Sequence, residues 1–280
     1  MITLATQRLI DLALEEDLGT GDQTTLATVA AEARCSASVV AKDTLVLAGG
    51  PFFKAVFHRV DPSVEVVQLE DEGARLTGGA VAFRLNGLAR SVLSAERTAL
   101  NILQRLSGTA TLTRQFVDAI EGTSAKVIDT RKTTPGMRAM QKHAVRVGGG
   151  WNHRFGLDSG VLIKENHIVS AGGVSRAVEL ARASSPHGLK VEVEVTCEAE
   201  FDAALLAGAD IIMLDNMTSP LIRKLVRRAR EQARPVLLEA SGNLGLERVA
   251  EVAQTGVDFL SIGALTHSAP AADLSMRFTL

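Results

Sequence analysis

The sequence has few of the residues that hold small exported proteins together. Its 280 residues include two cysteines, Cys35 and Cys197, which lie far apart in the chain. Two cysteines do not make the disulfide framework of a small secreted domain, and they do not supply the spaced thiolates of a structural zinc site. The disulfide-rich and zinc-finger classes of protein are therefore excluded.

Long apolar runs and a strong charge imbalance are also missing. No run approaches the ~20 apolar residues of a membrane span. Near the N-terminus Arg8, Asp11, Glu15, Glu16 and Asp17 alternate with leucines, unlike the layout of a signal peptide. The 30 Lys and Arg residues nearly balance the 32 Asp and Glu residues, whereas nonspecific nucleic-acid binders are usually basic. We expect a cytoplasmic protein that binds neither membranes nor nucleic acid.

What the sequence does contain is a large apolar fraction and one strongly basic segment. With 46% hydrophobic residues, the chain can form a core for one large or two ordinary domains. Between Arg131 and Lys164 it has seven Lys and Arg residues but one acid, Asp158. Arg131, Lys132, Arg154 and Lys164 lie among glycines or at the ends of apolar runs, which predicts pocket walls that bind anions.

The first part of the chain predicts a small α+β sandwich domain. Apolar periodicity favours helices at 6–18 and 51–60 and strands at 35–41, 63–69 and 80–85. A longer helix is expected to begin after an N-cap at Ser94, to break at Gly108 and to be followed by a second helix ending near Ile120. We place this domain at 1–107 and expect 267–280 to pack back on it.

The second part alternates regularly between short β-branched runs and amphipathic stretches. Such alternation predicts a parallel sheet with right-handed crossovers that curl it toward a barrel. Six strands can be counted, so we predict an incomplete, six- to seven-stranded parallel α/β barrel over 108–266. The expected strands are 127–128, 161–163, 191–195, 211–214, 236–238 and 259–262, and the expected helices are 139–148, 174–184, 199–207, 219–233 and 245–255.

Polar residues follow every predicted strand of the barrel, where barrel enzymes hold their catalytic groups. A single polar strand end has a simple explanation, since strands stop where polar loops begin. Six such strand ends in succession favour an active site. They are Asp129–Lys132, Lys164–Asn166, Glu192 with Glu194 and Thr196, Asp215–Asn216, Glu239 with Ser241–Asn243, and Gly263.

Carboxylates and glycines at these ends predict two kinds of subsite. Glu192 and Glu194 share one face of their strand, and with Asp215 they offer oxygen ligands suited to Mg²⁺ or Mn²⁺. The alternative is that these glutamates pair with inward-pointing lysines. Small residues at 240–243 and 262–264 let backbone N–H groups approach a phosphate.

Ordered motifs along nearly the whole chain resemble those of the quinolinate phosphoribosyltransferase family. They are L-E-E-D-L-G-T-G-D-Q-T-T, S-A-E-R-T-A-L-N-I-L, D-T-R-K-T-T-P-G, G-G-G-W-N-H-R, L-I-K-E-N-H, V-E-V-E-V, L-D-N-M and E-A-S-G-N. The resemblance implies a reaction of quinolinate with phosphoribosyl pyrophosphate (PRPP), which gives nicotinate mononucleotide, pyrophosphate and CO₂ in NAD biosynthesis. It also implies Mg²⁺ dependence and a homodimer or higher even oligomer with shared sites.

The resemblance assigns roles residue by residue. Arg131, Lys132, Lys164, Glu194 and Asp215 would be catalytic, and Glu194 and Asp215 would hold the metal. Quinolinate would contact Arg97 of a partner subunit and Thr130, Arg131, His153, Arg154 and Lys164. PRPP would contact Lys132, Ser241, Gly242, Asn243, Ile262, Gly263 and Ala264. Trp151 and Asn243 depart from the family's pattern and would change the shape of the pocket.

Three other functions are compatible with the residues. A lysine at a barrel strand end can form a Schiff base, so Lys164 also fits a lyase. A related phosphoribosyltransferase could act on another base, and borohydride trapping or a second pyridine substrate would separate these cases. A noncatalytic sugar-phosphate sensor would not need Glu194, Asp215 and so many cations together.

Overall fold

The computed structural model describes residues 2–279 of the chain. They form two compact units. Unit 1 contains the residues up to Arg114, Thr133–Gly149 and the segment from Ala264 onward, and unit 2 contains Gln115–Lys132 and Gly150–Gly263. The two units therefore do not correspond to a single boundary at residue 107, because Thr133–Gly149, which lies inside the predicted barrel domain, belongs to unit 1.

An antiparallel sheet forms the centre of unit 1. Its strand order is β12-β1-β5-β3, and the C-terminal strand pairs with β1, with Ala37 opposite Phe278. Buried Cys35, Ala37 and Val39 alternate with more exposed residues along β1, so one face of the sheet packs on the core. The strands are β1 (Arg34–Ala41), β3 (Glu65–Gln68), β5 (Val81–Leu88) and β12 (Leu274–Thr279), with β2 (Leu45–Val46) and β4 (Arg75–Leu76) as a separate pair.

Helices supply the rest of the core of unit 1. The Phe53 ring lies with its centroid 5.0 Å from that of Phe57 and 4.6 Å from that of Phe83. Met140 and Ala144 of α5 belong to the same apolar cluster, which explains why α5 is part of unit 1. The helices are α1 (Leu4–Leu18), α2 (Gln23–Thr28), α3 (Gly50–Val60), α4 (Ala89–Ala119), α5 (Arg138–Val147) and α11 (Ala264–His267).

The expectation for α4 was wrong at both its start and its middle. The helix begins at Ala89, so Ser94 is not its N-cap, and it continues through Gly108 to Ala119. A Cβ atom at Gly108 would lie 1.8 Å from the carbonyl oxygen of Pro270. The glycine therefore permits the chain near Pro270 to pack against the helix, and it does not end the helix.

A carboxylate fixes the N-terminus of α3 to α5. Glu72 accepts hydrogen bonds from the backbone N–H groups of Gly49 and Gly50, with a 2.7 Å contact at Gly50, and lies 2.9 Å from His143 Nε2. Burial acts to raise the pKa of Glu72, but the hydrogen bonds from His143, Gly49 and Gly50 outweigh it, and the pKa is lowered. A negative charge at a helix N-terminus is also favourable.

We predict that Glu72→Gln lowers the free energy of unfolding by about 1–2 kcal/mol near pH 7. A carboxyl group whose pKa is lower in the folded state stabilises the protein above its unfolded-state pKa, and this contribution disappears as the pH falls. The difference between variant and parent should therefore shrink below the ordinary carboxyl value of 4.5. Urea unfolding at several pH values from 7 to 4 measures this difference in the free energy of unfolding. Asp71→Asn, a change at an exposed carboxylate, is the control. A difference that does not change with pH would contradict the role given to the Glu72 carboxylate.

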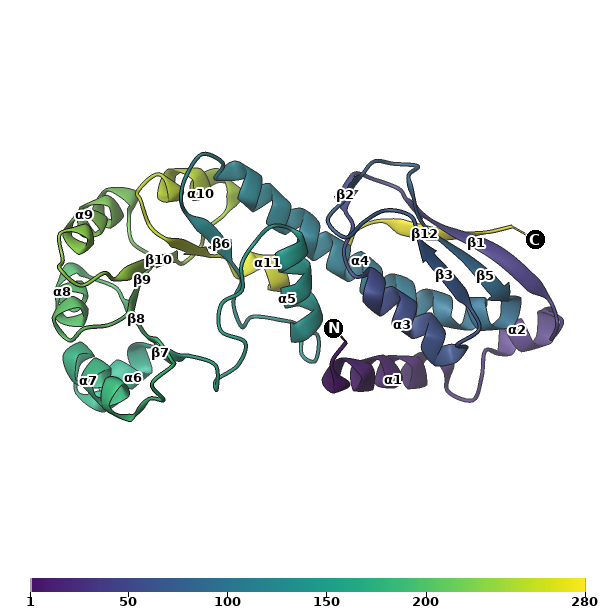
Figure 1. The fold of residues 1–280 in the computed structure, drawn as a ribbon, viewed down its shortest axis with the longest axis horizontal. Coiled ribbons are helices and arrows are strands. Elements are labelled where there is room, and N and C mark those ends of the chain that lie inside the picture. Colours follow the sequence, from purple (N-terminus) through teal and green to yellow (C-terminus); the bar gives the residue numbers. More distant parts are fainter. Residues whose placement is uncertain (1, 280) are drawn as a thin grey trace. The chain divides into compact units, whose positions relative to one another are not determined.

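Unit 2 is a curved sheet of six parallel strands. Its strand order is β6-β11-β10-β9-β8-β7, and Figure 1 shows helices α7, α8, α9 and α10 on the outer side of the curve. The strands are β6 (Lys126–Ile128), β7 (Val161–Ile163), β8 (Val191–Val195), β9 (Ile211–Asp215), β10 (Leu237–Ser241) and β11 (Phe259–Ser261). The helices are α6 (Glu165–Ala171), α7 (Val174–Ser184), α8 (Glu198–Leu206), α9 (Ser219–Arg230) and α10 (Leu246–Ala253).

The predicted fold class is confirmed, with six full strands in the parallel sheet. A single parallel bridge between Ile128 and Trp151 extends the sheet beyond β6. Trp151 N–H donates to the Val127 carbonyl at 2.8 Å, and Asp129 N–H donates to the Trp151 carbonyl at 3.1 Å. The sheet is thus an incomplete barrel with β6 and β7 at its edges. Over residues 2–279, no helix has the length and apolar character to cross a membrane.

Candidate active site

The carboxyl ends of the parallel strands bring predicted site residues to one edge of unit 2. Lys164 follows β7, Glu194 lies near the end of β8, and Asp215 and Ser241 are the last residues of β9 and β10. Since all six strands run in the same direction, these side chains come from the edge where barrels hold their active sites.

Asp129, directly after β6, anchors the segment that carries His153. It is fully buried. Its Oδ2 accepts a 2.6 Å hydrogen bond from Asn152 Nδ2, and its Oδ1 accepts a 2.9 Å bond from the His153 N–H. The sequence predicted a polar strand end here but no role for Asp129 or Asn152. Their positions in the D-T-R-K and W-N-H-R motifs were the available signal.

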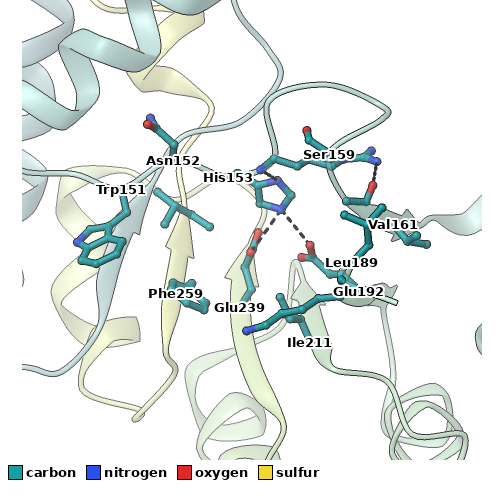
Figure 2. Close-up of a pocket in the computed structure, with 15 residues that line it drawn as sticks. Trp151, Asn152, His153, Ser159, Val161, Leu189, Glu192, Ile211, Glu239 and Phe259 are labelled. Atoms are coloured by element: carbon teal, nitrogen blue, oxygen red, sulfur yellow. Dashed lines mark hydrogen bonds and ion pairs between the residues drawn. The ribbon is translucent and has the colours of Figure 1, made fainter. Parts of the chain in front are cut away.

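His153 points toward two buried glutamates in the interior of the curved sheet (Figure 2). Its Nδ1 accepts a 2.7 Å hydrogen bond from the Arg154 N–H. This leaves the hydrogen on Nε2, which lies 3.0 Å from Glu192 Oε2 and 3.7 Å from Glu239 Oε2. The Arg154 N–H thus fixes the tautomer of the ring, and Nε2–H donates to Glu192.

The two glutamates are both buried beside His153. Their side chains are 6% and 2% exposed for Glu192 and Glu239. Burial is the main cause that raises the pKa of Glu239 well above the usual carboxyl value, and the charge of Glu192 adds to it. Its surroundings therefore favour the protonated form of Glu239, while Glu192 accepts from His153. Period-2 alternation predicts that Glu192 faces inward beside Glu194, but no sequence pattern assigns a role to Glu239.

Arg131 lies close enough to Arg154 in unit 2 for its positive charge to act on Arg154. Desolvation lowers the pKa of Arg154, and repulsion by the positive charge of Arg131 lowers it further. Arg154 Nη1 donates to the Gly160 carbonyl at 2.9 Å, which holds the guanidinium against its own loop. Two neighbouring arginines, one of them partly desolvated, can bind a planar dianion, because a bound carboxylate relieves their repulsion.

Lys164 and Glu194 form an ion pair at the carboxyl edge. The Lys164 Nζ atom lies 2.9 Å from Glu194 Oε2, and the two side chains are 52% and 18% exposed. The alternative prediction, that an inward glutamate pairs with a lysine, therefore holds for Glu194 in this structure. Lys164 is also the N-cap residue of α6, and His167 Nδ1 accepts a 3.0 Å hydrogen bond from the Lys164 N–H.

Glu194 and Asp215 remain suitable as oxygen ligands for Mg²⁺. They lie near the ends of adjacent strands, and Asp215 is held by a 2.8 Å hydrogen bond from Asn216 Nδ2. Mg²⁺ usually takes one or two protein carboxylates and fills its other positions with water and substrate phosphate, so this donor set fits. Within the described part of the chain, the three-residue cluster with metal-ligand spacing is instead His153, Glu192 and Glu239.

Two asparagines adopt left-handed backbone conformations in the loops after β9 and β10. Asn216 has a φ of 53° and Asn243 a φ of 49°, and Gly242 between the strand and Asn243 has a φ of 93°. A Cβ atom at Gly242 would lie 2.3 Å from Asn216 Oδ1. Ser241, Gly242 and Asn243 thus form a tight turn of the kind that exposes backbone N–H groups to an anion.

The other predicted residues are distributed over both units. Lys132 N–H donates to Thr130 Oγ1 at 3.0 Å, so Thr130 shapes the loop after β6. Ile262 N–H donates to the Ile128 carbonyl at 3.0 Å, and Gly263 is the last residue of unit 2. Ala264 starts α11 in unit 1, and Arg97 is exposed on α4 of the same unit.

Comparison with known proteins gives consistent matches over both predicted domains. The chain matches the family models "Quinolinate phosphoribosyl transferase, N-terminal domain" at 22–107 and "C-terminal domain" at 109–277. It is 41% identical to a probable nicotinate-nucleotide pyrophosphorylase (carboxylating) of Bacillus subtilis, covering 99% of this chain and 94% of that protein. It is 44% identical to the Mycobacterium leprae nicotinate-nucleotide pyrophosphorylase (carboxylating), covering 97% and 96%. The solved structure of the Francisella tularensis nicotinate-nucleotide pyrophosphorylase has a TM-score of 0.92 at 42% identity, covering 98% and 96%.

Proposed function

Because this chain belongs to the quinolinate phosphoribosyltransferase family, we propose that the cations at the carboxyl edge of its parallel sheet bind the two carboxylates of quinolinate. The enzyme transfers phosphoribosyl from PRPP to quinolinate and releases pyrophosphate and CO₂, giving nicotinate mononucleotide for NAD biosynthesis. The observation that carries the site assignment is the proximity of Arg131 to the partly desolvated Arg154, whose pKa is lowered by desolvation and by the charge of Arg131.

In the proposed complex, Arg131 and Arg154 each bind a carboxylate through a planar guanidinium fork. Lys164 leaves its ion pair with Glu194 to contact the substrate, and the Thr130 hydroxyl orients the same ring. His153 donates no proton in this state, because its Nε2–H already contacts Glu192. The ring held by Arg154 and Lys164 presents its nitrogen to the ribose.

The reaction needs little acid–base chemistry from the protein. The pyridine nitrogen of quinolinate carries no proton, so it attacks the ribose carbon directly as pyrophosphate departs. Positioning and stabilisation of charge then supply most of the rate acceleration. Once alkylated, the ring is cationic and stabilises the electron pair left on the ring carbon when the adjacent carboxylate leaves as CO₂, and that carbon then takes a proton from solvent. Lys132 would stabilise the negative charge that gathers on the departing pyrophosphate, while Arg131 holds a carboxylate of quinolinate.

The PRPP subsite is proposed at the glycine-rich strand ends. The backbone of Ser241–Asn243 and of 262–264 would bind the 5-phosphate, and Lys132 would bind the pyrophosphate. Mg²⁺ held by Glu194 and Asp215 would supply positive charge to the pyrophosphate oxygens. The Lys164–Glu194 ion pair supports a coupling between the two binding events. When Lys164 binds the substrate, Glu194 becomes available to bind the metal.

We predict that Asp215→Asn raises the Mg²⁺ concentration needed for half-maximal turnover by about tenfold, because the neutral amide is a weaker ligand than the carboxylate. Quinolinate binding to the metal-free enzyme should be nearly unchanged. Initial rates over a Mg²⁺ series and calorimetry with quinolinate measure the two quantities. Glu179→Gln, an exposed change on α7, is the matched control, and full parental activity in excess chelator would refute the requirement.

Product analysis tests the reaction itself. Quinolinate and PRPP should give CO₂ and pyrophosphate in equal amounts, whereas nicotinate and PRPP should give no pyrophosphate. Turnover of nicotinate at a comparable rate would assign the chain to a phosphoribosyltransferase for another base. We further propose that the enzyme acts in the cytoplasm as a homodimer or a higher even oligomer, with Arg97 of a partner subunit completing each quinolinate site.

A further inference from the structure

A fully buried glutamine, Gln141 of α5, joins two segments of unit 1 that are far apart in the sequence. Its Oε1 atom accepts a 2.8 Å hydrogen bond from the Thr134 N–H, and its Nε2 atom donates a 2.9 Å hydrogen bond to the Thr266 carbonyl. Figure 1 shows α5 beside α11, the helix that contains Thr266. Because one partner is a donor and the other an acceptor, a side-chain amide can bind both, whereas a carboxylate or an apolar side chain cannot.

The Thr134 end of this link is held by a turn that leads into α5. The Met137 N–H donates to the Thr134 carbonyl at 3.0 Å. Between them lie Pro135 and Gly136, and Gly136 has a φ of 80°, which a type II turn needs at its third residue. The Gln141 N–H then donates to the Met137 carbonyl at 2.9 Å. The turn and the start of α5 are therefore fixed to each other, and the Gln141 side chain fixes both to α11.

Both segments that Gln141 links continue from neighbouring strands of unit 2. β6 pairs with β11, and the Ile262 N–H donates to the Ile128 carbonyl at 3.0 Å where the two strands end. Two loops follow, which we call the β6 loop (residues 129–133) and the β11 loop (residues 263–265). They are joined at their starts by this backbone hydrogen bond and at their ends by the Gln141 amide. Loops that are already fixed at both ends lose less conformational entropy when a ligand binds to them.

We propose that Gln141 is a positioning residue for PRPP, because its amide holds the β6 loop and the β11 loop in fixed relative positions. This inference rests on the proposed function, in which Lys132 of the β6 loop contacts the pyrophosphate and the backbone of the β11 loop contacts the 5-phosphate. PRPP must then bind both loops at once, whereas quinolinate contacts only the β6 loop of the two. Gln141 acts through the loops, so its loss should weaken PRPP binding more than quinolinate binding.

Steady-state kinetics of the full-length protein test this difference, with each substrate varied while the other is saturating. Gln141→Met keeps the approximate length of the side chain and removes both hydrogen bonds. It should raise the KM for PRPP about tenfold and change the KM for quinolinate less than about threefold. Gln141→Asn keeps the amide but is too short to reach both partners, so it should shift the same KM and gives the answer if Gln141→Met does not fold.

Glu72→Gln is the matched control, since it weakens a different attachment of α5, the contact of Glu72 with His143, and leaves the Gln141 link intact. It should keep the parental KM for both substrates. An unchanged KM for PRPP in the Gln141 variants, an equal rise for both substrates, or the same rise in Glu72→Gln would overturn the proposal. Each of these results would mean that Gln141 supports the fold of unit 1 and does not position the PRPP loops.

Hydrogen exchange followed by mass spectrometry provides a readout that needs no turnover. In Gln141→Met the backbone amides of the β6 loop and the β11 loop should exchange at least about tenfold faster than in the parent, while those of β8 and β9 keep their protection. Unchanged exchange in both loops would overturn the proposal. Inactivity of the parent protein with quinolinate and PRPP would overturn the proposed function and the role toward PRPP with it. An active parent with unchanged KM values in the Gln141 variants would overturn only the role of Gln141.

Discussion

Replacing Arg154 by alanine is expected to weaken quinolinate binding by about 2–5 kcal/mol, because it removes one partner of a desolvated charge pair. PRPP binding should change far less. The pKa of Arg154 is lowered by desolvation and by the charge of Arg131, so the guanidinium is partly desolvated before the substrate arrives. A carboxylate that binds to Arg154 supplies the guanidinium with interactions that water does not provide.

Isothermal calorimetry with each substrate separately measures the effect. Arg176→Ala is the matched control, since Arg176 forms an exposed surface pair with Glu179 on α7, and it should leave both affinities unchanged. Arg154→Lys keeps the charge but loses the planar fork, and it should fall between the parent and the alanine variant. Equal weakening of quinolinate and PRPP binding would mean that Arg154 supports the fold of the loop and not the dicarboxylate.

Local sequence patterns were sufficient to predict the parallel sheet of unit 2. Each strand is a short, mainly apolar run between polar loops, and α7 has the predicted bounds Val174–Ser184. Because parallel strands place their carboxyl ends at one edge, the edge of the sheet that holds Lys164 and Asp215 followed from the strand positions alone. Periodicity therefore located much of the proposed site, although it gave no distances between its residues.

Features that depend on distant contacts could not be predicted. Gly108 resembles a helix breaker until the chain near Pro270 is placed against it. The helix α5 has the amphipathic pattern of a barrel helix, but its buried Met140 belongs to the core of unit 1. His153, Glu192 and Glu239 are far apart in sequence, so their association depends on the curvature of the sheet. The left-handed conformations of Asn216 and Asn243 likewise depend on how adjacent loops meet.

The position of Arg97 leads to the prediction with the most distinctive outcome. Arg97 is exposed on α4 of unit 1, and since α4 begins at Ala89 the residue lies in its third turn, not in its first as expected. Across residues 2–279 of one chain, its guanidinium forms no ion pair, although its charge acts on neighbouring Glu96. A cation of this kind can complete the site of a partner subunit, and two-fold symmetry would supply the contact twice.

Mixing two inactive variants tests this arrangement. Arg97→Ala and Arg131→Ala should each lose nearly all activity as homodimers, while their thermal unfolding stays close to that of the parent. If Arg97 serves the partner, a heterodimer of the two has one site with both defects and one with neither, so it should recover about half of the parental activity. If Arg97 serves its own subunit, each site of the heterodimer keeps one defect and mixing restores nothing. Subunit exchange must be verified by mass spectrometry of differently tagged chains. A lack of recovery shows that Arg97 serves its own subunit only if heterodimers have formed.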